Sequence, residues 1–483
     1  MRFPADGMAE TPLTDRSRRH FVATGAARAV GALMLGHGLL DAQAAPASMA
    51  SASAASSAGQ GTDAPWQNWS GLQRSAPASF HFPADEAGLA QWMRGSRGEL
   101  RAVGAGHSFT ALVPTAGAMV SLDQLSGLVA VDRQKMQVRV KAGTRLGVLA
   151  RALDDHGLAL RNLPDIDVQS LAGAISTGTH GTGAALPALH ADVVGLRIVK
   201  PDGQIAELHE DLDRDAMAAA RVSLGSFGLI SEMTLKVLPA YNLHRRVWLE
   251  PIDKLLARAP QLARQHRHFE FYYLPFTGYA AGISHDLYTG QDLLLPASQD
   301  EAFLDDLRML RDWLGRFPAL RTWVAQKFID PDMKEEARHR AHRLLSTVRP
   351  MRFNETEWHV PRERGIDCLR EIIRTIERRN EVFFPMEFRF TQADDAWLSP
   401  FHGRDSCSIA VHAAVGEAHD YLLTDCTPVF ATHGGRPHWG KLHPLRQADL
   451  ARLYPRWREF LGMRQRFDPQ GRMLNAHLRQ LFF

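Results

Sequence analysis

Two glycine-rich loops constrain the fold of this chain more than any other feature. The first is Val103–Phe109 (VGAGHSF) and the second is Gly173–Gly183 (GAISTGTHGTG). Glycine lets a backbone approach a ligand closely and point several N–H groups at one anion, and Ser and Thr hydroxyls add further donors. Neither loop has the spacing of a Rossmann fingerprint or a Walker motif. Such loops suit a pyrophosphate, and a set of tight turns is the alternative.

Short strands and helices alternate around these loops. Leu100–Val103 and Gln137–Lys141 are expected to be strands, the second because of its period-two alternation. Leucines at helical spacing predict a helix over 145–156. Asp202-Gly203 between two β-rich runs predicts a hairpin turn. We expect this part of the chain to be an α+β domain.

The sequence changes character in its second half. Runs rich in Arg, Glu, Asp and Leu at helical spacing predict helices over 299–314 and 333–347. Strand-like runs return at 269–274, 382–390 and 407–413. These patterns predict an α+β cap, built from an antiparallel sheet with helices on it.

The N-terminus looks like an export signal. Arg18 and Arg19 precede a small, apolar stretch, and an A-x-A cleavage site follows that ends at Ala44. This pattern resembles a bacterial twin-arginine signal, and Arg28 makes the stretch a poor transmembrane helix. A disordered basic tail is the alternative. We expect export through the twin-arginine translocon to the periplasm or beyond. The Ala-, Ser- and Gly-rich run 45–64 is expected to be a disordered linker.

Composition narrows the choice of partners. The 483 residues include 56 Lys and Arg against 53 Asp and Glu, so the formal net charge is only +3 and a nucleic-acid partner is not expected. The three cysteines, Cys368, Cys407 and Cys426, fit no zinc motif and argue against a disulfide-built fold. We expect five segments: a signal peptide (1–44), a linker (45–64), a cofactor-binding domain (65–240), a cap (241–432) and a C-terminal segment that returns to the first domain (433–483).

A strand in the cap carries a candidate substrate site. In Phe383–Phe390 (FFPMEFRF), Glu387 and Arg389 project from one face of the strand while Met386 and its even-numbered neighbours face the core. A carboxylate beside a guanidinium can bind a polyol, since one accepts and the other donates hydrogen bonds. A surface ion pair is the alternative.

A second candidate motif is Gly434–Lys441 (GGRPHWGK), near the C-terminus. His433, His438 and His443 recur there at intervals of five, which does not bring ligands to one point, so no metal site is expected.

Together these motifs resemble the FAD-binding domain of the vanillyl-alcohol oxidase superfamily, in its aldonolactone oxidase branch. The family has a V-G-x-G-H-S segment around the diphosphate and a G-T-H-G-T-G loop, as in Val103–Ser108 and Gly178–Gly183. The runs 163–173, 223–230 and 466–475 are also similar to the family. The resemblance covers most of the chain after the export signal. It implies a vanillyl-alcohol-oxidase-type FAD domain of two α+β subdomains, followed by the cap.

The resemblance also implies roles for single residues. The family histidine at the position of His107 commonly carries the flavin through its 8-methyl group, although a turn residue with non-covalent FAD remains an alternative. A second, cysteinyl link is not expected, because no cysteine precedes Cys368. The implied cofactor-binding residues are Gly104, Ala105, Gly106, His107, Ser108, Ser170, Gly173, Ser176, Thr177, Gly178, Thr179, His180, Gly181, Thr182, Gly183 and Ile230. For His180, ordering of its loop is the simpler role.

The family places the E-x-R pair and a lysine in front of the flavin. Glu387, Arg389 and Lys441 are therefore the expected catalytic and substrate-binding residues, with Lys441 able to stabilise negative charge on the reduced flavin. His412 could line the substrate site or pack in the core.

The expected reaction is hydride transfer from a sugar-derived alcohol to flavin N5, with oxygen as acceptor. An aldono-1,4-lactone is the first expectation for the substrate and an alditol the second. A dehydrogenase that passes electrons to a quinone or cytochrome is a rival, and peripheral membrane association is compatible with it. A non-redox periplasmic carbohydrate-binding protein is the alternative from a different class.

Overall fold

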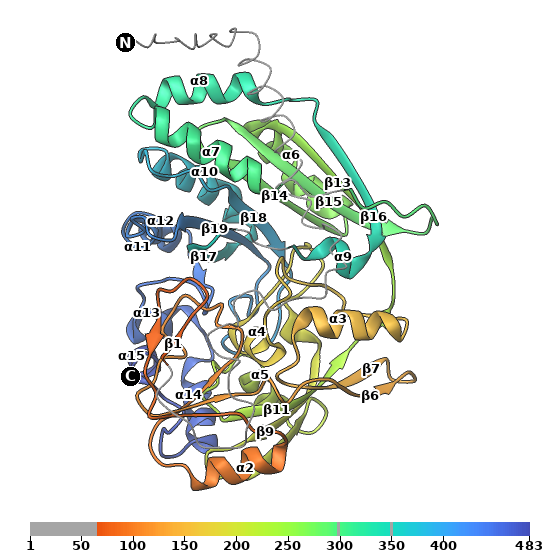
Figure 1. Cartoon of the computed structure of the whole chain (residues 1–483), viewed down its shortest axis with the longest axis vertical. Coiled ribbons are helices and arrows are strands. Elements are labelled where there is room, and N and C mark those ends of the chain that lie inside the picture. The colour runs from red at the N-terminus through yellow and green to blue at the C-terminus, as the bar shows by residue number, and fades with distance from the viewer. Residues whose placement is uncertain (1–64, 297–299, 348–350) are drawn as a thin grey trace, which may run out of the picture.

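The computed structural model describes residues 65–296, 300–347 and 351–483 (Figure 1). The expected export signal and linker lie outside these residues. Within the described ranges, no helix combines the length and the apolar character that crossing a bilayer requires.

The first half of the chain forms two α+β units, as the sequence predicts. One is a three-stranded parallel sheet in the order β3 (Ser79–His81), β5 (Ala118–Ser121), β4 (Leu100–Val103). The other is a five-stranded antiparallel sheet in the order β10 (Ile205–His209), β9 (Val193–Val199), β11 (Leu229–Lys236), β7 (Gln137–Lys141), β6 (Leu128–Asp132). The associated helices are α2 (Glu86–Gly95), α3 (Leu146–Asp155), α4 (Leu171–Thr177) and α5 (Arg214–Ala220).

Local sequence explains several of these elements. The predicted strands Leu100–Val103 and Gln137–Lys141 are confirmed as β4 and β7. The predicted helix is α3, which buries Leu146, Leu149 and Leu153 on one face. Gly203 has a φ of +77° in the turn between β9 and β10, a conformation that favours glycine. The predicted hairpin is therefore confirmed.

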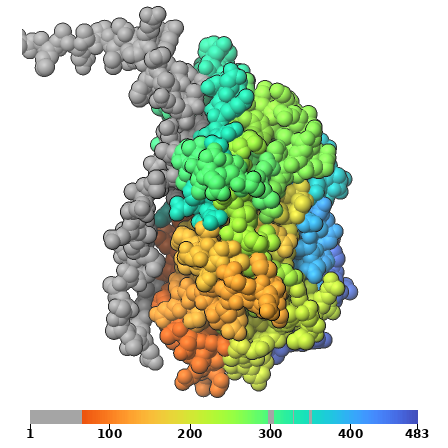
Figure 2. Space-filling model, turned by 90° about the vertical axis from the view of Figure 1, so that its right-hand side faces the viewer, coloured from red at the N-terminus to blue at the C-terminus, as the bar shows by residue number. Residues whose placement is uncertain are grey.

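The cap is built on an eight-stranded antiparallel sheet. Its order is β16 (Lys334–Arg340), β13 (Asn242–Pro251), β15 (Tyr279–Tyr288), β14 (His268–Leu274), β18 (Met386–Thr391), β19 (Ser406–Ala414), β17 (Phe353–Pro361), β20 (Arg436–Pro437). Helices α6 (Ile252–Gln265) and α10 (Gly365–Ile376) share one apolar core with the sheet, which includes Leu255, Phe271, Ile372 and Phe388. Helices α7 (Asp300–Leu314) and α8 (Pro318–Phe328) lie at the end of the cap far from the first domain (Figure 1). In the space-filling view the cap, in green, stacks on the first domain, in orange and yellow (Figure 2).

Two expectations for the cap need correction. Residues 333–347 are not one helix, because Lys334–Arg340 is the edge strand β16 and only Ala341–Leu345 is helical, as α9. Seven consecutive pairings with β13, from Trp248↔Lys334 to Asn242↔Arg340, outweigh the helix propensity of this charged run. The strand expected from residue 382 begins instead at Met386, directly after Pro385, which has no N–H to donate to a ladder.

The C-terminal segment packs against the first domain. Helices α13 (Gln447–Leu453), α14 (Trp457–Phe467) and α15 (Ala476–Phe482) contribute Leu450, Phe460 and Leu478 to its core. The buried Arg101 guanidinium donates to the carbonyl oxygens of Leu112 at 2.8 Å, Leu224 at 3.0 Å and Met473 at 2.7 Å. Arg101 therefore ties the end of the chain to the segment next to the first glycine loop.

Candidate active site

One cavity of about 500 Å³ lies between the first domain and the cap. Both halves of the chain supply its walls. The expected residues that line it are Gly104, Ala105, Gly106, His107, Ser108, Ser170, Gly173, Ser176, Thr177, Thr179, His180, Ile230, Glu387, Arg389, His412 and Lys441. The structure therefore brings most residues of the predicted site into one space.

The first glycine loop follows β4 and is shaped to hold an anion. Within the described residues, the backbone N–H groups of Ala105–Ser108 donate to no other protein atom. Gly104 lies so close to Ser170 that a Cβ would sit 2.1 Å from the Ser170 Oγ. Gly106 has a φ of +69°, which favours glycine. Four adjacent free N–H groups on a cavity wall suit the diphosphate of FAD.

The second glycine loop divides its contacts between the cavity and the cap. Of its residues from Gly173 to His180, six line the cavity. Ile175 does not, and neither does Gly178, which ends α4 with a φ of +80°. Gly181, Thr182 and Gly183 do not line the cavity. The Thr182 hydroxyl donates to the Phe269 carbonyl at 2.6 Å, and the Gly183 N–H donates to the Phe390 carbonyl at 2.8 Å. This half of the loop joins the first domain to the cap sheet.

His107 lies on the cavity wall against an aromatic side chain. Its imidazole is tilted by 32° against the Trp69 indole, with ring centroids 5.1 Å apart. Burial, reinforced by the charges of Lys441 and Arg145, lowers the pKa of His107 to about 4. The ring is therefore neutral near pH 7, which is the form that can act as a nucleophile.

Arg389 is the centre of a buried ion-pair network. Its Nη2 lies 2.6 Å from Glu357 Oε1 and 3.1 Å from Glu387 Oε2, and its Nη1 lies 3.4 Å from Asp165 Oδ2. Burial alone would lower the pKa of Arg389, but the charges of Glu387, Glu357 and Asp165 hold it well above its usual value. The Tyr272 hydroxyl donates to Glu387 at 2.5 Å. The prediction that Glu387 and Arg389 share one face of the strand is confirmed, and this face lines the cavity.

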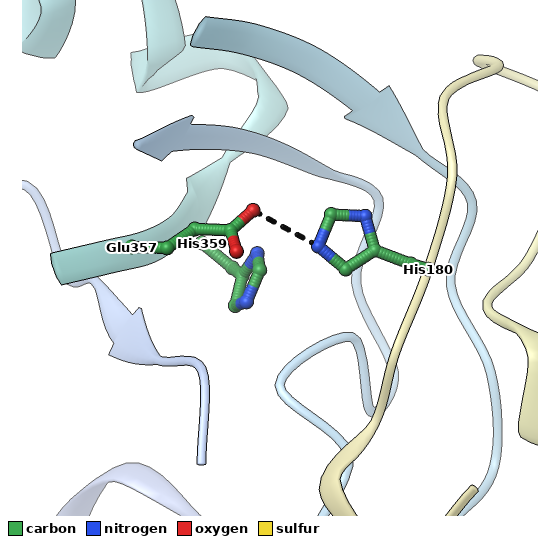
Figure 3. A group of neighbouring side chains, drawn as sticks. All are labelled: His180, Glu357 and His359. Atoms are coloured by element: carbon green, nitrogen blue, oxygen red, sulfur yellow. Dashed lines mark hydrogen bonds and ion pairs between the residues drawn. The ribbon is translucent and has the colours of Figure 1, made fainter. Parts of the chain in front are cut away.

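Glu357 contacts both Arg389 and His180, and Figure 3 shows its carboxylate directed at the His180 ring. The His180 Nε2 lies 3.1 Å from Glu357 Oε1, the oxygen that also accepts from Arg389. Burial would raise the pKa of Glu357, but the charges of Arg389 and His180 hold it well below its usual value. His180 thus does more than order its loop, because it helps to fix the anion that holds Arg389.

His180, Glu357 and His359 also have metal-ligand types within reach of one another. One ligand atom of each lies within 4.8 Å of the others. However, the Glu357 oxygen is 2.6 Å from the Arg389 guanidinium, whose charge would repel a cation there. We therefore assign this group to the ion-pair network.

Lys441 and His412 each contact one carboxylate oxygen of Glu355. The Lys441 ammonium pairs with Glu355 Oε2 and lies 5.2 Å from the centre of the Phe109 ring. His412 Nε2 is 3.7 Å from Glu355 Oε1, and its ring meets the Phe353 ring edge to face at 4.8 Å. Both side chains line the cavity, and His412 also packs against Phe353.

Sequence reasoning missed five residues of this site. Glu355 and Glu357 lie two residues apart on β17, so they share a strand face, and this spacing could have shown a second acidic face. Tyr272 lies directly opposite Glu387 in the sheet, which only the strand register reveals. Asp165 and Trp69 lie in loops without periodicity, so no local pattern marks them.

Comparisons with known proteins agree with this geometry. A family model described as "D-arabinono-1,4-lactone oxidase" matches residues 233–481, and one described as "FAD binding domain" matches residues 77–209. The chain is 34% identical to an L-gulono-1,4-lactone dehydrogenase of Mycobacterium tuberculosis over 86% of this chain and 98% of that protein. It is 30% identical to the L-gulonolactone oxidase of Mus musculus and 29% identical to an alditol oxidase of Streptomyces, each with the same coverage.

Solved structures support the fold. Cholesterol oxidase from Brevibacterium sterolicum, in a His121Ala form, superposes with a TM-score of 0.70 at 14% identity, covering 88% of this chain and 100% of that one. The likeness confirms the predicted α+β fold, while the FAD-binding domain is shown by the family model over residues 77–209.

Proposed function

Because this chain belongs to the D-arabinono-1,4-lactone oxidase family, we propose that it oxidises the hydroxyl group of an aldono-1,4-lactone. The chain is an FAD-dependent oxidoreductase that acts on CH–OH groups of sugar-derived alcohols. The observation that carries the proposal is that the glycine loop with its free N–H groups, His107 and the Glu387–Arg389 pair meet in one cavity of about 500 Å³.

The side chains in the cavity can take different roles in the reaction. FAD supplies the electron sink for the substrate hydride. Glu387 and Arg389 can hold substrate hydroxyls, one accepting and the other donating hydrogen bonds. Arg389 and Lys441 bring positive charge to the cavity, where it would stabilise negative charge on a reduced flavin.

A substrate and acceptor panel tests this function. We expect turnover of an aldono-1,4-lactone to exceed that of an open-chain alditol by at least about tenfold in kcat/KM, a difference of about 1.4 kcal/mol. Hydrogen peroxide release and dye reduction under air, measured side by side, separate oxygen from another acceptor. Faster turnover of the alditol would assign the site to a polyol instead. A colourless protein that binds sugars would contradict the enzymatic function altogether.

We further propose that FAD is bound covalently through His107. A bond between a His107 ring nitrogen and the 8-methyl carbon of the flavin requires that the methyl carbon and the imidazole nitrogen each lose one proton. The two electrons released reduce the flavin ring, and the enzyme's own electron acceptor removes them. The neutral state of the buried imidazole supports this proposal, since protonated imidazole is not a nucleophile.

Acid precipitation tests the covalent link. We expect the flavin absorbance of the wild-type protein to remain with the precipitate. In His107→Ala we expect the flavin to appear in the supernatant, with FAD still bound before acid treatment, because the free N–H groups of the loop remain. His156→Ala, which changes an exposed histidine outside the cavity, should keep its flavin in the precipitate. Wild-type flavin that washes out in acid would contradict the link.

Export by the twin-arginine route and peripheral membrane association are also proposals. The first rests on the motif at Arg18 and Arg19, and periplasmic recovery of the protein from bacteria, lost on Arg18→Lys with Arg19→Lys, tests it.

Peripheral membrane association is supported by the end of the cap that α7 and α8 form (Figure 1). Trp313 on α7, Trp323 on α8 and Phe317 in the turn between them are exposed there. Such aromatic side chains suit a membrane interface. Co-sedimentation with vesicles that is unchanged in Trp313→Ser with Trp323→Ser would contradict it.

A further inference from the structure

A short hairpin at the start of the described chain is hydrogen-bonded to the loop that carries His107. Strands β1 (Trp66–Gln67) and β2 (Arg74–Ser75) pair, and the residues between them reach across to this loop. The Trp69 N–H donates to the Gly106 carbonyl at 2.8 Å, on the N-terminal side of His107. On the other side, Asn68 Nδ2 donates to the Ser108 carbonyl at 2.9 Å. The Gln73 Nε2 donates to the Phe109 carbonyl, also at 2.9 Å.

These hydrogen bonds fix the backbone on both sides of the His107 side chain. The hairpin side chains that do this are themselves held, since Asn68 Oδ1 accepts from the Gln73 N–H at 2.9 Å. Within the described residues, the loop's own N–H groups from Ala105 to Ser108 are left without protein acceptors. The hairpin therefore binds the carbonyl oxygens of the loop and leaves the N–H groups of the loop available to the cofactor.

Trp69 adds a platform for the imidazole itself. Its indole backs the His107 ring with centroids 5.1 Å apart. The indole in turn packs edge to face against two phenyl rings. The centroid distance and interplanar angle are 5.1 Å and 75° to Phe353, and 6.4 Å and 81° to Phe109. Phe353 begins β17 of the cap. The platform is therefore complete only when the cap has folded onto the first domain.

We propose that Trp69 is a positioning residue for covalent flavin attachment, a role that rests on the proposed His107 link. A free imidazole would sample several rotamers, whereas a ring backed by a rigid indole spends more of its time in one orientation towards the cavity. Restricting a nucleophile in this way raises the rate of bond formation without changing its chemistry. Because Phe353 completes the platform, attachment occurs after the cap has docked.

The test follows attachment in the purified holoenzyme and during reconstitution with FAD of apoprotein that was produced in riboflavin-starved cells and still carries His107. The readouts are acid-stable flavin against time and total bound FAD. For Trp69→Leu, which keeps an apolar side chain without a ring, we expect attachment to slow about tenfold while total FAD stays within twofold of wild type. Trp69→Phe restores a ring and should attach at near the wild-type rate. A role in folding alone would lower total FAD and attachment together.

Trp92→Leu is the matched control. Trp92 also stacks on a histidine, His81, with centroids 5.1 Å apart, but neither residue lines the cavity. Flavin attachment in Trp92→Leu should proceed at the wild-type rate. Attachment in Trp69→Leu at the wild-type rate would overturn the positioning role and leave the covalent link intact. Wild-type flavin that is fully acid-extractable would instead overturn the link, so the two failures are distinguishable.

Discussion

Replacing Arg389 with Met is expected to lower kcat/KM by about a thousandfold. Removing one preorganised donor from an anion-stabilising site costs about 10²–10³ in rate. The variant also loses the hydrogen bonds that Arg389 would donate to substrate hydroxyls. The change leaves Glu357 and Glu387 buried without the cation that now lies 2.6 Å and 3.1 Å from them. We therefore also expect a lower melting temperature, since an unpaired buried charge costs about 3–5 kcal/mol.

Arg389→Lys should recover little of this loss. One ammonium group cannot bridge Glu357, Glu387 and Asp165 as the planar guanidinium does. Arg246→Met is a matched control on the same sheet, because Arg246 is half exposed and pairs at the surface with Asp286 at 3.4 Å. That control should keep wild-type kcat/KM and flavin content. Activity of Arg389→Met within fivefold of wild type, at equal flavin content, would remove Arg389 from the catalytic machinery.

The partners of Arg389 also show where sequence reasoning succeeds and where it ends. The period of a β-strand is local, so FFPMEFRF alone predicts that Glu387 and Arg389 share a face. What surrounds that face depends on strand order. Glu357 comes from β17, which is separated from β18 by β19, and Asp165 comes from a loop of the other domain. No local pattern encodes these long-range contacts.

The same limit explains the wrong helix at 333–347. Lys334–Arg340 has the composition of an exposed helix, and nothing within the run signals that β13 offers it an unpaired edge. The glycine loops behave differently, because their function is carried by the backbone of consecutive residues. Their role at the cavity was therefore accessible from sequence, whereas the turn of Gly181–Gly183 towards the cap was not.

Lowering the pH from about 7 to about 4 is expected to remove most of the stability of the folded protein. Burial lowers the pKa of His438 and His443 to about 3, and those of His107 and His477 to about 4. In the unfolded chain a histidine titrates near 6.5. Between about pH 6.5 and 4 the unfolded state thus binds protons that the folded state does not. The free energy of unfolding must therefore fall as the pH falls, by up to about 1.4 kcal/mol per pH unit for each such histidine.

Carboxyl groups modify this slope in both directions. Burial raises the pKa of Asp167 and Asp192, so the folded state takes up these protons early and regains some stability as the pH falls. Burial would also raise the pKa of Glu357, but the charge of Arg389 holds it well below its usual value. The stability that Glu357 contributes is lost only at still lower pH, below about 4.5. Above pH 5 the buried histidines outnumber these carboxyl groups, so the free energy of unfolding falls as the pH falls.

Urea unfolding followed by far-UV circular dichroism at pH 7, 6 and 5 measures this slope. His443 packs near the Trp439 ring at 6.2 Å and lies outside the cavity, so His443→Phe removes one acid-sensitive group without touching the site. We expect its slope between pH 6.5 and 5 to be smaller than that of wild type by up to about 1.4 kcal/mol per pH unit. His156→Gln, at an exposed position, should keep the wild-type slope. A wild-type free energy of unfolding that is constant from pH 7 to 5 would mean that these imidazoles are protonated while still buried, and the neutral His107 on which flavin attachment depends would be lost with them.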